Sequence, residues 1–396
     1  MTSNKSTHTI FSKEFNENPY PTYETIRETE PVYRFLLPDG QYAWMITKYE
    51  DAVEALKDLR FSKDMAGVMG ISKEDESIFT HNMLFADPPD HKRLRGLVQK
   101  AFTPRMIEGM RGRIQEITDE LLDEASGKDH MNLIDEFAFP LPIIVICEIL
   151  GIPKEDREKF RLWSNTMIEG SAGENSENMA LHTREFTQYL GEKFAEARKN
   201  PQQDLLSQLI ISEEEGDKLT EKELYGVVSL LIIAGHETTV NLIGNSILSL
   251  LEHPEQLKLL KERPELIHTA LEESLRYEGP VEFSTSRWAK DDFEFKGQSI
   301  QKGQLVIIAL NSANRDSSQY TDADVFNITR EKSKHLAFGK GIHMCLGAPL
   351  ARLEGEIAIN SLLQRFPNIQ LKGKTSELDW RPGMVVRGVK ELPLTL

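Results

Sequence analysis

Cysteine is scarce in this chain: only Cys147 and Cys345 occur among its 396 residues. Two thiols cannot make the disulfide framework of a small secreted protein, and such sparse use is typical of a reducing compartment. The first residues, Met1 to Lys5, lack the apolar core of a signal peptide. We therefore expect a cytoplasmic protein.

Long apolar runs and excess positive charge are missing as well. No run reaches the roughly 18 to 20 apolar residues that span a bilayer, and the longest, 141–150 and 227–234, are typical of buried helix. Lysine and arginine number 47 against 63 acidic residues, which gives a net charge of −16. Neither a membrane nor nucleic acid is therefore an expected partner.

What is present is an ordinary globular composition, with 39% hydrophobic and 28% charged residues. Length alone suggests roughly two or three domains, but the chain has no internal repeat, low-complexity tract or convincing linker. Helical patterns dominate 88–200, and strand-like alternation is limited to 32–46, 298–310 and a predicted terminal hairpin at 381–396. We predict one domain, 1–396, that is mainly α with small β-sheets.

Cys345 lies in the loop Phe338 to Gly347, which contains three glycines. Glycines at this density indicate positive φ angles or a close approach of the backbone to another group. A helical pattern resumes at Ala348, with Pro349 early in the helix, and amides at a helix N-terminus favour a thiolate. The loop therefore predicts a site that holds a metal cofactor. A small buried hydrophobic residue in a glycine turn is the alternative, and for a lone cysteine it is the more common case.

A long helix is predicted to begin at a capping box formed by Thr220 and Glu223. Apolar residues occupy nearly every face of 227–251, which is typical of a central, buried helix. Its middle, Ala234 to Thr239, is nevertheless polar and contains Gly235, which costs about 1 kcal/mol relative to alanine. Buried polar groups at this point indicate either a distorted functional segment or a close helix crossing beside a wet crevice.

Glu273 and Arg276 are spaced as neighbours on one turn of a helix. Such pairs are usually solvated surface bridges worth about 0.2–0.5 kcal/mol. The apolar stripe of this helix points nearly opposite to Arg276, so spacing alone predicts a surface pair.

Four further donors are scattered along the chain: His91, Arg95, Arg287 and His343. Each is unremarkable by itself. Together they would suit a cofactor with two carboxylates, because arginine binds carboxylates in a bidentate manner.

Taken together, these motifs resemble those of the cytochrome P450 family, in particular its soluble bacterial members. The resemblance rests on three motifs in register and covers essentially the whole chain, with further similarity at 87–95 and 313–316. The three motifs are Phe338-Gly339-x-Gly341-x-His343-x-Cys345-Leu346-Gly347, Ala234-Gly235-x-Glu237-Thr238-Thr239 and Glu273-x-x-Arg276. The resemblance implies a cytochrome P450 fold in which the long central helix passes over a haem.

The resemblance also implies roles for the cofactor residues. Cys345 would be the thiolate ligand of the iron of haem b, and amides around Leu346 and Gly347 would moderate its charge. The haem propionates would be bound by His91, Arg95, Arg287 and His343. Cys147, in an apolar helix, is assigned no such role.

On the opposite side of the haem, Ala234 and Gly235 would leave room for dioxygen, and Glu237 and Thr238 would relay protons to it. The family pattern also implies a buried charge triad of Glu273, Arg276 and Arg330, which replaces the surface interpretation of Arg276. Two positions depart from the pattern: Lys340 stands where relatives often have histidine, and Glu237 where some have aspartate.

The implied activity is that of a monooxygenase that hydroxylates or epoxidises a medium to large apolar small molecule. The chain has no Gly-x-Gly-x-x-Gly fingerprint and no cysteine cluster for iron and sulfur. Electrons are therefore expected from a ferredoxin or flavodoxin with its NAD(P)H-dependent reductase, docking on a monomer near basic residues. These residues are Lys92, Arg93, Lys332, Lys334 and Lys340.

Two alternatives remain open. A peroxide-using relative is the first, although such enzymes typically lack the acid and alcohol pair found at Glu237 and Thr238. A haem-binding sensor or carrier without turnover is the second.

The substrate pocket is predicted to be mainly apolar, with Glu282, Ser284 and Thr285 as possible polar anchors. The chain is most similar to the branch that includes macrolide and polyketide hydroxylases, while fatty acids, steroids and terpenoids stay open as substrates. The predicted lining segments are 65–85, the helices flanking 170–176, 230–234, 281–285 and 384–385.

Overall fold

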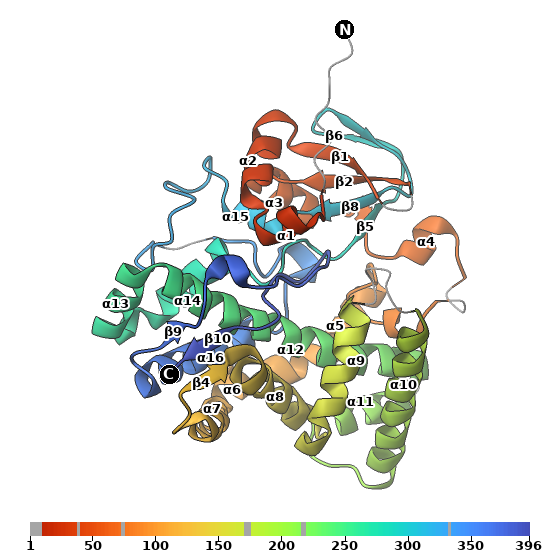
Figure 1. The fold of residues 1–396 in the computed structure, drawn as a ribbon. Coiled ribbons are helices and arrows are strands. Elements are labelled where there is room, and N and C mark those ends of the chain that lie inside the picture. The colour runs from red at the N-terminus through yellow and green to blue at the C-terminus, as the bar shows by residue number, and fades with distance from the viewer. Residues whose placement is uncertain (1–9, 38–39, 73–75, 170–175, 215–218, 332–333) are drawn as a thin grey trace.

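The computed structural model describes residues 10–37, 40–72, 76–169, 176–214, 219–331 and 334–396, and it shows a helical part packed beside a smaller β part (Figure 1). The predicted turn residues 38–39, the polar break at 170–175 and Lys332 lie outside this description. The mainly α fold with small sheets is confirmed.

The largest sheet brings the two ends of the chain together. The hairpin expected at 32–46 forms as β1 and β2, and β2 pairs in parallel with β8, more than 250 residues later in sequence. The strands are, in sheet order, β1 (Val32–Leu36), β2 (Tyr42–Ile46), β8 (Leu305–Ile308), β5 (Arg287–Ala289) and β3 (Phe61–Ser62).

Two smaller sheets complete the β structure. β6 (Phe293–Phe295) pairs with β7 (Gln298–Ile300); only β7 lies within the predicted alternation at 298–310. The prediction of a terminal hairpin at 381–396 is wrong. β10 (Pro393–Thr395) instead pairs with β4 (His130–Asn132) and β9 (Gln370–Leu371), because distant segments offer edges that a strand of three residues can join.

The helical part is built around α12 (Glu221–Glu252), which packs against α8, α14 and α16. The predicted capping box is present: Thr220 N donates to Glu223 Oε2 at 2.8 Å, and Glu223 N donates to Thr220 Oγ1 at 3.3 Å. These bonds satisfy two amides that the first turn leaves unpaired.

The remaining helices cover α12 and the sheet (Figure 1). They are α1 (Lys13–Glu17), α2 (Tyr20–Thr29), α3 (Tyr49–Lys57), α4 (Met65–Met69), α5 (Asp90–Gln99), α6 (Pro104–Gly109), α7 (Arg111–Ala125), α8 (Pro140–Leu150), α9 (Arg157–Glu169), α10 (Ser176–Lys199), α11 (Leu205–Glu214), α13 (Pro254–Glu262), α14 (Ile267–Tyr277), α15 (Leu310–Asn314) and α16 (Ala348–Arg365).

By length and composition α12 could cross a membrane. Its apolar residues are interrupted by polar ones, so uninterrupted apolar runs in the sequence did not indicate this. A window of 18 residues within it has a mean hydropathy of 1.5, but 72% of that window is buried inside the protein. Burial by protein is what a core helix requires, and the packing around α12 accounts for its apolar faces.

Candidate active site

The loop that carries Cys345 has the geometry its glycines predict. Gly339 and Gly341 have φ angles of 67° and 78°, and a Cβ on Gly341 would lie 2.8 Å from the carbonyl oxygen of Leu56 in α3. Cys345 N donates to Phe338 O at 2.9 Å and closes the loop. The backbone is thus fixed just before α16 begins at Ala348.

The two cysteines differ in their surroundings. Cys345 lies deep enough for burial to raise the pKa of its thiol, yet it is exposed, so it faces a space rather than packed atoms. Amides of Gly347 and Ala348 act against this rise, while Leu346 packs on the core. In the protein alone burial outweighs the amides, contrary to the expectation of a thiolate. Cys147 is buried in apolar surroundings, which raise its pKa to about 12.

The four scattered donors converge beside this loop. The rings of His91 and His343 lie 4.4 Å apart, and Arg95 Nη2 donates to Met344 O at 2.8 Å. Arg287, on β5, donates from Nη1 to Phe61 O at 3.3 Å. His91 Nε2 and Arg287 Nε are buried, and neither has a hydrogen-bond partner among the described residues.

Lys63 also belongs to this region, and sequence reasoning missed it. It is 1% exposed, and its Nζ donates to the Thr285 carbonyl at 2.7 Å, to the Thr285 hydroxyl and to Ser286 O at 3.1 Å. Burial and nearby Arg287 hold its pKa well below the usual value. A lysine directly after the short strand β3 was the only signal in the sequence. Below, the cation cluster means Lys63, His91, Arg95, Arg287 and His343.

Positive charge is in excess in the cation cluster. Burial, followed by the proximity of His91, Lys63 and Arg287, lowers the pKa of His343 to about 3. Asp87 is the carboxylate that acts on Lys63 and Arg287, and it already forms an ion pair with Lys290 at 2.8 Å. Because Asp87 is already paired with Lys290, positive charge in the cation cluster stays in excess, which disfavours burial unless an anion binds.

The middle of α12 remains α-helical, so the expected distortion is not observed. Ala234 is exposed, and Thr238 Oγ1 donates to Ala234 O at 3.0 Å. A Cβ on Gly235 would meet Ile146 at 3.4 Å, an ordinary contact, so a close helix crossing does not require glycine here. The small residues and the hydroxyl thus border open space on this face of the helix.

Glu237, in contrast, is buried beside other ionisable side chains. It is 1% exposed, with Oε1 3.3 Å from His236 Nε2 and Oε2 3.8 Å from Arg381 Nη1. Burial acts to raise the pKa of its carboxyl, but His236, Arg381 and Arg161 together lower it. Among the hydrogen bonds of the described residues, none joins Glu237 to the Thr238 hydroxyl.

The Glu273 triad, formed by Glu273, Arg276 and Arg330, is buried as the resemblance implied. Arg276 is 0% exposed and donates to both oxygens of Glu273, at 2.9 and 2.8 Å. Arg330 Nε donates to the same carboxylate at 3.0 Å. The surface interpretation was wrong because α15 and the segment around Ala323 cover the side of α14 that its apolar stripe leaves polar.

The proposed polar anchors of the substrate pocket have other partners. Glu282 Oε1 accepts from Tyr23 Oη at 2.5 Å, and Arg387 lies 3.5 Å from Oε2. Ser284 Oγ accepts from Ile308 N at 3.2 Å, and Thr285 accepts from Lys63. Their positions in the sequence did not reveal these distant partners, and the role of these residues as substrate anchors stays a prediction.

The expected docking residues are only partly accessible. Arg93 is half-buried and pairs with Glu223 at 2.5 Å and with Asp90 at 3.1 Å. Lys92 and Lys334 are exposed.

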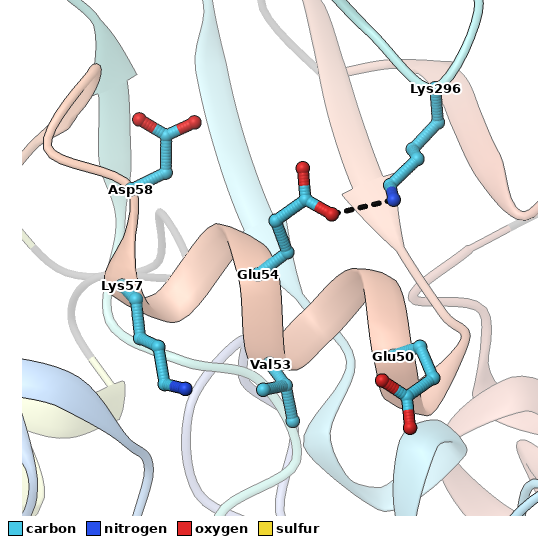
Figure 2. A pocket seen from close by; sticks show the side chains of 6 residues that line it. All are labelled: Glu50, Val53, Glu54, Lys57, Asp58 and Lys296. Atoms are coloured by element: carbon cyan, nitrogen blue, oxygen red, sulfur yellow. Dashed lines mark ion pairs between the residues drawn. The ribbon is translucent and has the colours of Figure 1, made fainter.

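A surface groove of about 520 Å³ on α3 is a separate feature (Figure 2). Lys296 reaches across it to Glu54 at 2.6 Å. Its lining is almost entirely charged, unlike the mainly apolar pockets that hold organic molecules. The lining residues are Glu50, Val53, Glu54, Lys57, Asp58 and Lys296.

Comparisons with known proteins agree with this geometry. The family model "Cytochrome P450" matches residues 8–151 and 165–393. The polyketide biosynthesis cytochrome P450 PksS of Bacillus subtilis is 46% identical over 395 residues, covering 97% of each chain. The cytochrome P450 monooxygenase PikC of Streptomyces venezuelae is 42% identical, covering 96% of this chain and 92% of its own.

Solved structures give the same result. The myxobacterial cytochrome P450 CYP267B1, in complex with myristic acid, superposes with a TM-score of 0.93 at 40% identity, covering 97% of this chain and 98% of its own. The structure of PksS superposes with a TM-score of 0.92 at 45% identity, covering 98% and 99%. Matches of this identity over nearly the whole length establish common ancestry as well as a common fold. The chain therefore belongs to the cytochrome P450 family, in the bacterial branch that includes the polyketide and macrolide enzymes.

Proposed function

We propose that Cys345 is the axial thiolate ligand of the haem iron and that the cation cluster binds the haem propionates. Members of this family are monooxygenases that bind haem b through a cysteine thiolate. The observation that supports these assignments is the convergence of buried, unpaired donors on the space that Cys345 faces.

The residues present fit the group in charge and in donor type. Two propionates carry two negative charges, which would offset the excess positive charge of the cation cluster. His91 Nε2 and Arg287 Nε would gain the hydrogen-bond partners they lack. Gly347 and Ala348 would donate their amides to the sulfur and share its charge once the metal removes the thiol proton.

Haem with a thiolate ligand supplies dioxygen activation, by which one oxygen atom enters the substrate and the other becomes water. The chain contributes space and protons. Ala234 and Gly235 keep the helix face open, and the Thr238 hydroxyl, now donating to Ala234 O, lies next to that face. Glu237 is assigned the acid role in proton delivery. These assignments follow the positions of the side chains on α12.

The substrate class and partners are part of the proposal. We infer an apolar molecule of medium to large size, supported by relatives named for polyketide biosynthesis and by neighbours bound to myristic acid and tirandamycin C. A ferredoxin or flavodoxin with its NAD(P)H-dependent reductase would supply electrons, docking near exposed Lys92 and Lys334. Free cysteines fit a reducing compartment such as the cytoplasm, where we expect the protein to act as a monomer.

Replacement of Cys345 tests the haem assignment. The reduced carbon monoxide complex of the purified protein is expected to show the absorption band of thiolate ligation. Cys345→Ala should lose this band, because no other cysteine faces the site, while Cys147→Ala should retain it. Persistence of the band in Cys345→Ala, or its loss in Cys147→Ala alone, would contradict the assignment.

A further inference from the structure

His236 precedes Glu237 on α12 and is 0% exposed. Its Nδ1 lies 2.6 Å from the carbonyl oxygen of Ile232, one turn earlier. A carbonyl oxygen can only accept a hydrogen bond, so Nδ1 carries a proton. The tautomer of His236 is therefore fixed, and Nε2 is the atom that can gain or lose a proton.

That atom faces Glu237. Nε2 lies 3.3 Å from Glu237 Oε1, and neither atom has another hydrogen-bond partner among the described residues. If Nε2 and the carboxylate both lacked a proton, a lone pair would face a negative charge in a buried site. One proton must therefore lie between His236 and Glu237.

Two further groups bear on where the proton lies. Arg381, from the C-terminal segment, has Nη1 3.8 Å from Glu237 Oε2. Arg161 of α9 also acts on Glu237, although it is paired with Asp135 of the turn Ile134–Ala138. The edge of Phe139 packs against the imidazole ring at 5.6 Å between centroids. These positive groups favour the carboxylate, with the shared proton on His236 Nε2.

We propose that His236 is a positioning residue that holds the proton which Glu237 delivers toward the oxygen site. This inference rests on the function proposed above and names a source for its proton. In each delivery the Nε2–H bond of His236 breaks and an O–H bond forms on Glu237. His236 is left as neutral imidazole with Nδ1–H still bonded to Ile232 O, and a proton from a solvent hydronium ion later restores Nε2–H.

The physical reason lies in the cost of moving a buried charge. Glu237 has no hydrogen bond to Thr238, so its carboxyl group must turn from His236 and Arg381 before it delivers a proton. A carboxylate that turned away charged would leave the protonated His236 without its counter-charge in a buried site. A carboxylic acid that has first taken the proton of His236 leaves a neutral imidazole behind and turns at lower cost.

Two variants of His236 and one matched control test this inference in the haem-loaded enzyme with a surrogate ferredoxin, its reductase and NADPH. His236→Gln keeps a donor near Nε2 but cannot release a proton. His236→Asn keeps a donor to Ile232 O and no longer reaches Glu237. His253→Gln is the control, since His253 Nδ1 also contacts a carbonyl of α12, that of Ser249 at 2.7 Å, and no ion pair with a carboxylate is found there in the described part of the chain.

Both His236 variants are expected to lower product per NADPH at least tenfold, raise peroxide release and increase the solvent deuterium isotope effect. Should one variant fail to load haem, the other provides the test. Unchanged coupling and an unchanged isotope effect in a haem-loaded variant would overturn the inference. Absence of the thiolate band and of turnover in the wild type would instead overturn the proposed function.

Discussion

Two groups of charged side chains, the Glu273 triad and the cation cluster, differ in how completely their charges and hydrogen-bond donors are paired. In the Glu273 triad, Arg276 and Arg330 both donate to one carboxylate, and Arg276 also donates to the carbonyls of Asn314 and Ala323. In the cation cluster, His91 Nε2 and Arg287 Nε have no hydrogen-bond partner. Both groups contain fully buried and partly buried side chains, so burial alone does not distinguish them.

This difference in pairing distinguishes charged groups that stabilise the fold from charged groups that form a binding site. A buried charge is tolerated when its partners are complete, and removing one partner of such a set costs about 3–5 kcal/mol. A buried donor without a partner costs about 1–3 kcal/mol, which the folded protein bears where a ligand can later satisfy it. The balance of partners therefore indicates the role of each cluster.

The largest expected effect is on the Glu273 triad. Glu273→Gln leaves Arg276 and Arg330 buried without a counter-charge, so the free energy of unfolding should fall by about 3–5 kcal/mol. Chemical denaturation measures this change in the free energy of unfolding. Glu148→Gln is the control: Glu148 pairs with Arg113, both about one third exposed, and should cost below about 1 kcal/mol. Equal losses in the two variants would contradict the assigned structural role.

The second largest effect is expected on haem release when the cation cluster is changed. Lys63→Met and Arg287→Leu remove buried positive charge but also remove donors to the Thr285, Ser286 and Phe61 carbonyls, so the haem-free protein should lose at most about 1–3 kcal/mol of stability. The haem-loaded protein should release haem at least tenfold faster, measured by transfer to an excess of apomyoglobin. Lys290→Met is the control, since Lys290 is 38% exposed and pairs with Asp87, and its effect should be smaller. Parallel loss of stability with and without haem would assign the cluster to the fold instead.

A third buried ionisable group sharpens the comparison because no cation of the described residues pairs with it. Glu354 of α16 is 1% exposed, its Oε2 lacks a partner, and burial raises its pKa from 4.5 to about 8. Its stabilising contribution is complete below pH 4.5 and is lost as pH rises through 8. Between pH 6 and 7 it should lower the free energy of unfolding by about 1.4 kcal/mol.

Glu354→Gln should remove this dependence and leave the protein more stable than wild type at pH 7 by thermal or chemical unfolding. Cys345 should remain haem-ligated in this variant, as the carbon monoxide complex would show. The same pH slope in wild type and variant would mean that Glu354 is ionised in the folded protein.

Features that depend on neighbouring residues were predicted correctly. The capping box at Thr220 and Glu223, the positive φ angles of Gly339 and Gly341, and the β1–β2 pairing all form as expected. Each rests on hydrogen bonds or steric limits within a few residues, so local sequence is sufficient. The convergence of His91, Arg95, Arg287 and His343 was predicted only through the family pattern.

Features that depend on distant partners were missed. Glu282 was taken for a pocket anchor, but Tyr23 and Arg387 lie beside it. Lys63 was overlooked because its acceptors, Thr285 and Ser286, are more than 200 residues away in sequence.

The sequence by itself determined the family, the long central helix and the cysteine loop, because motif order and local spacing carry that information. Only the tertiary structure decided which charges are paired, which remain in surplus, and that Glu237 faces His236 and Arg381 rather than Thr238. The physical reason is that a charge pair forms across space between side chains whose separation in sequence is unrelated to their distance in the fold.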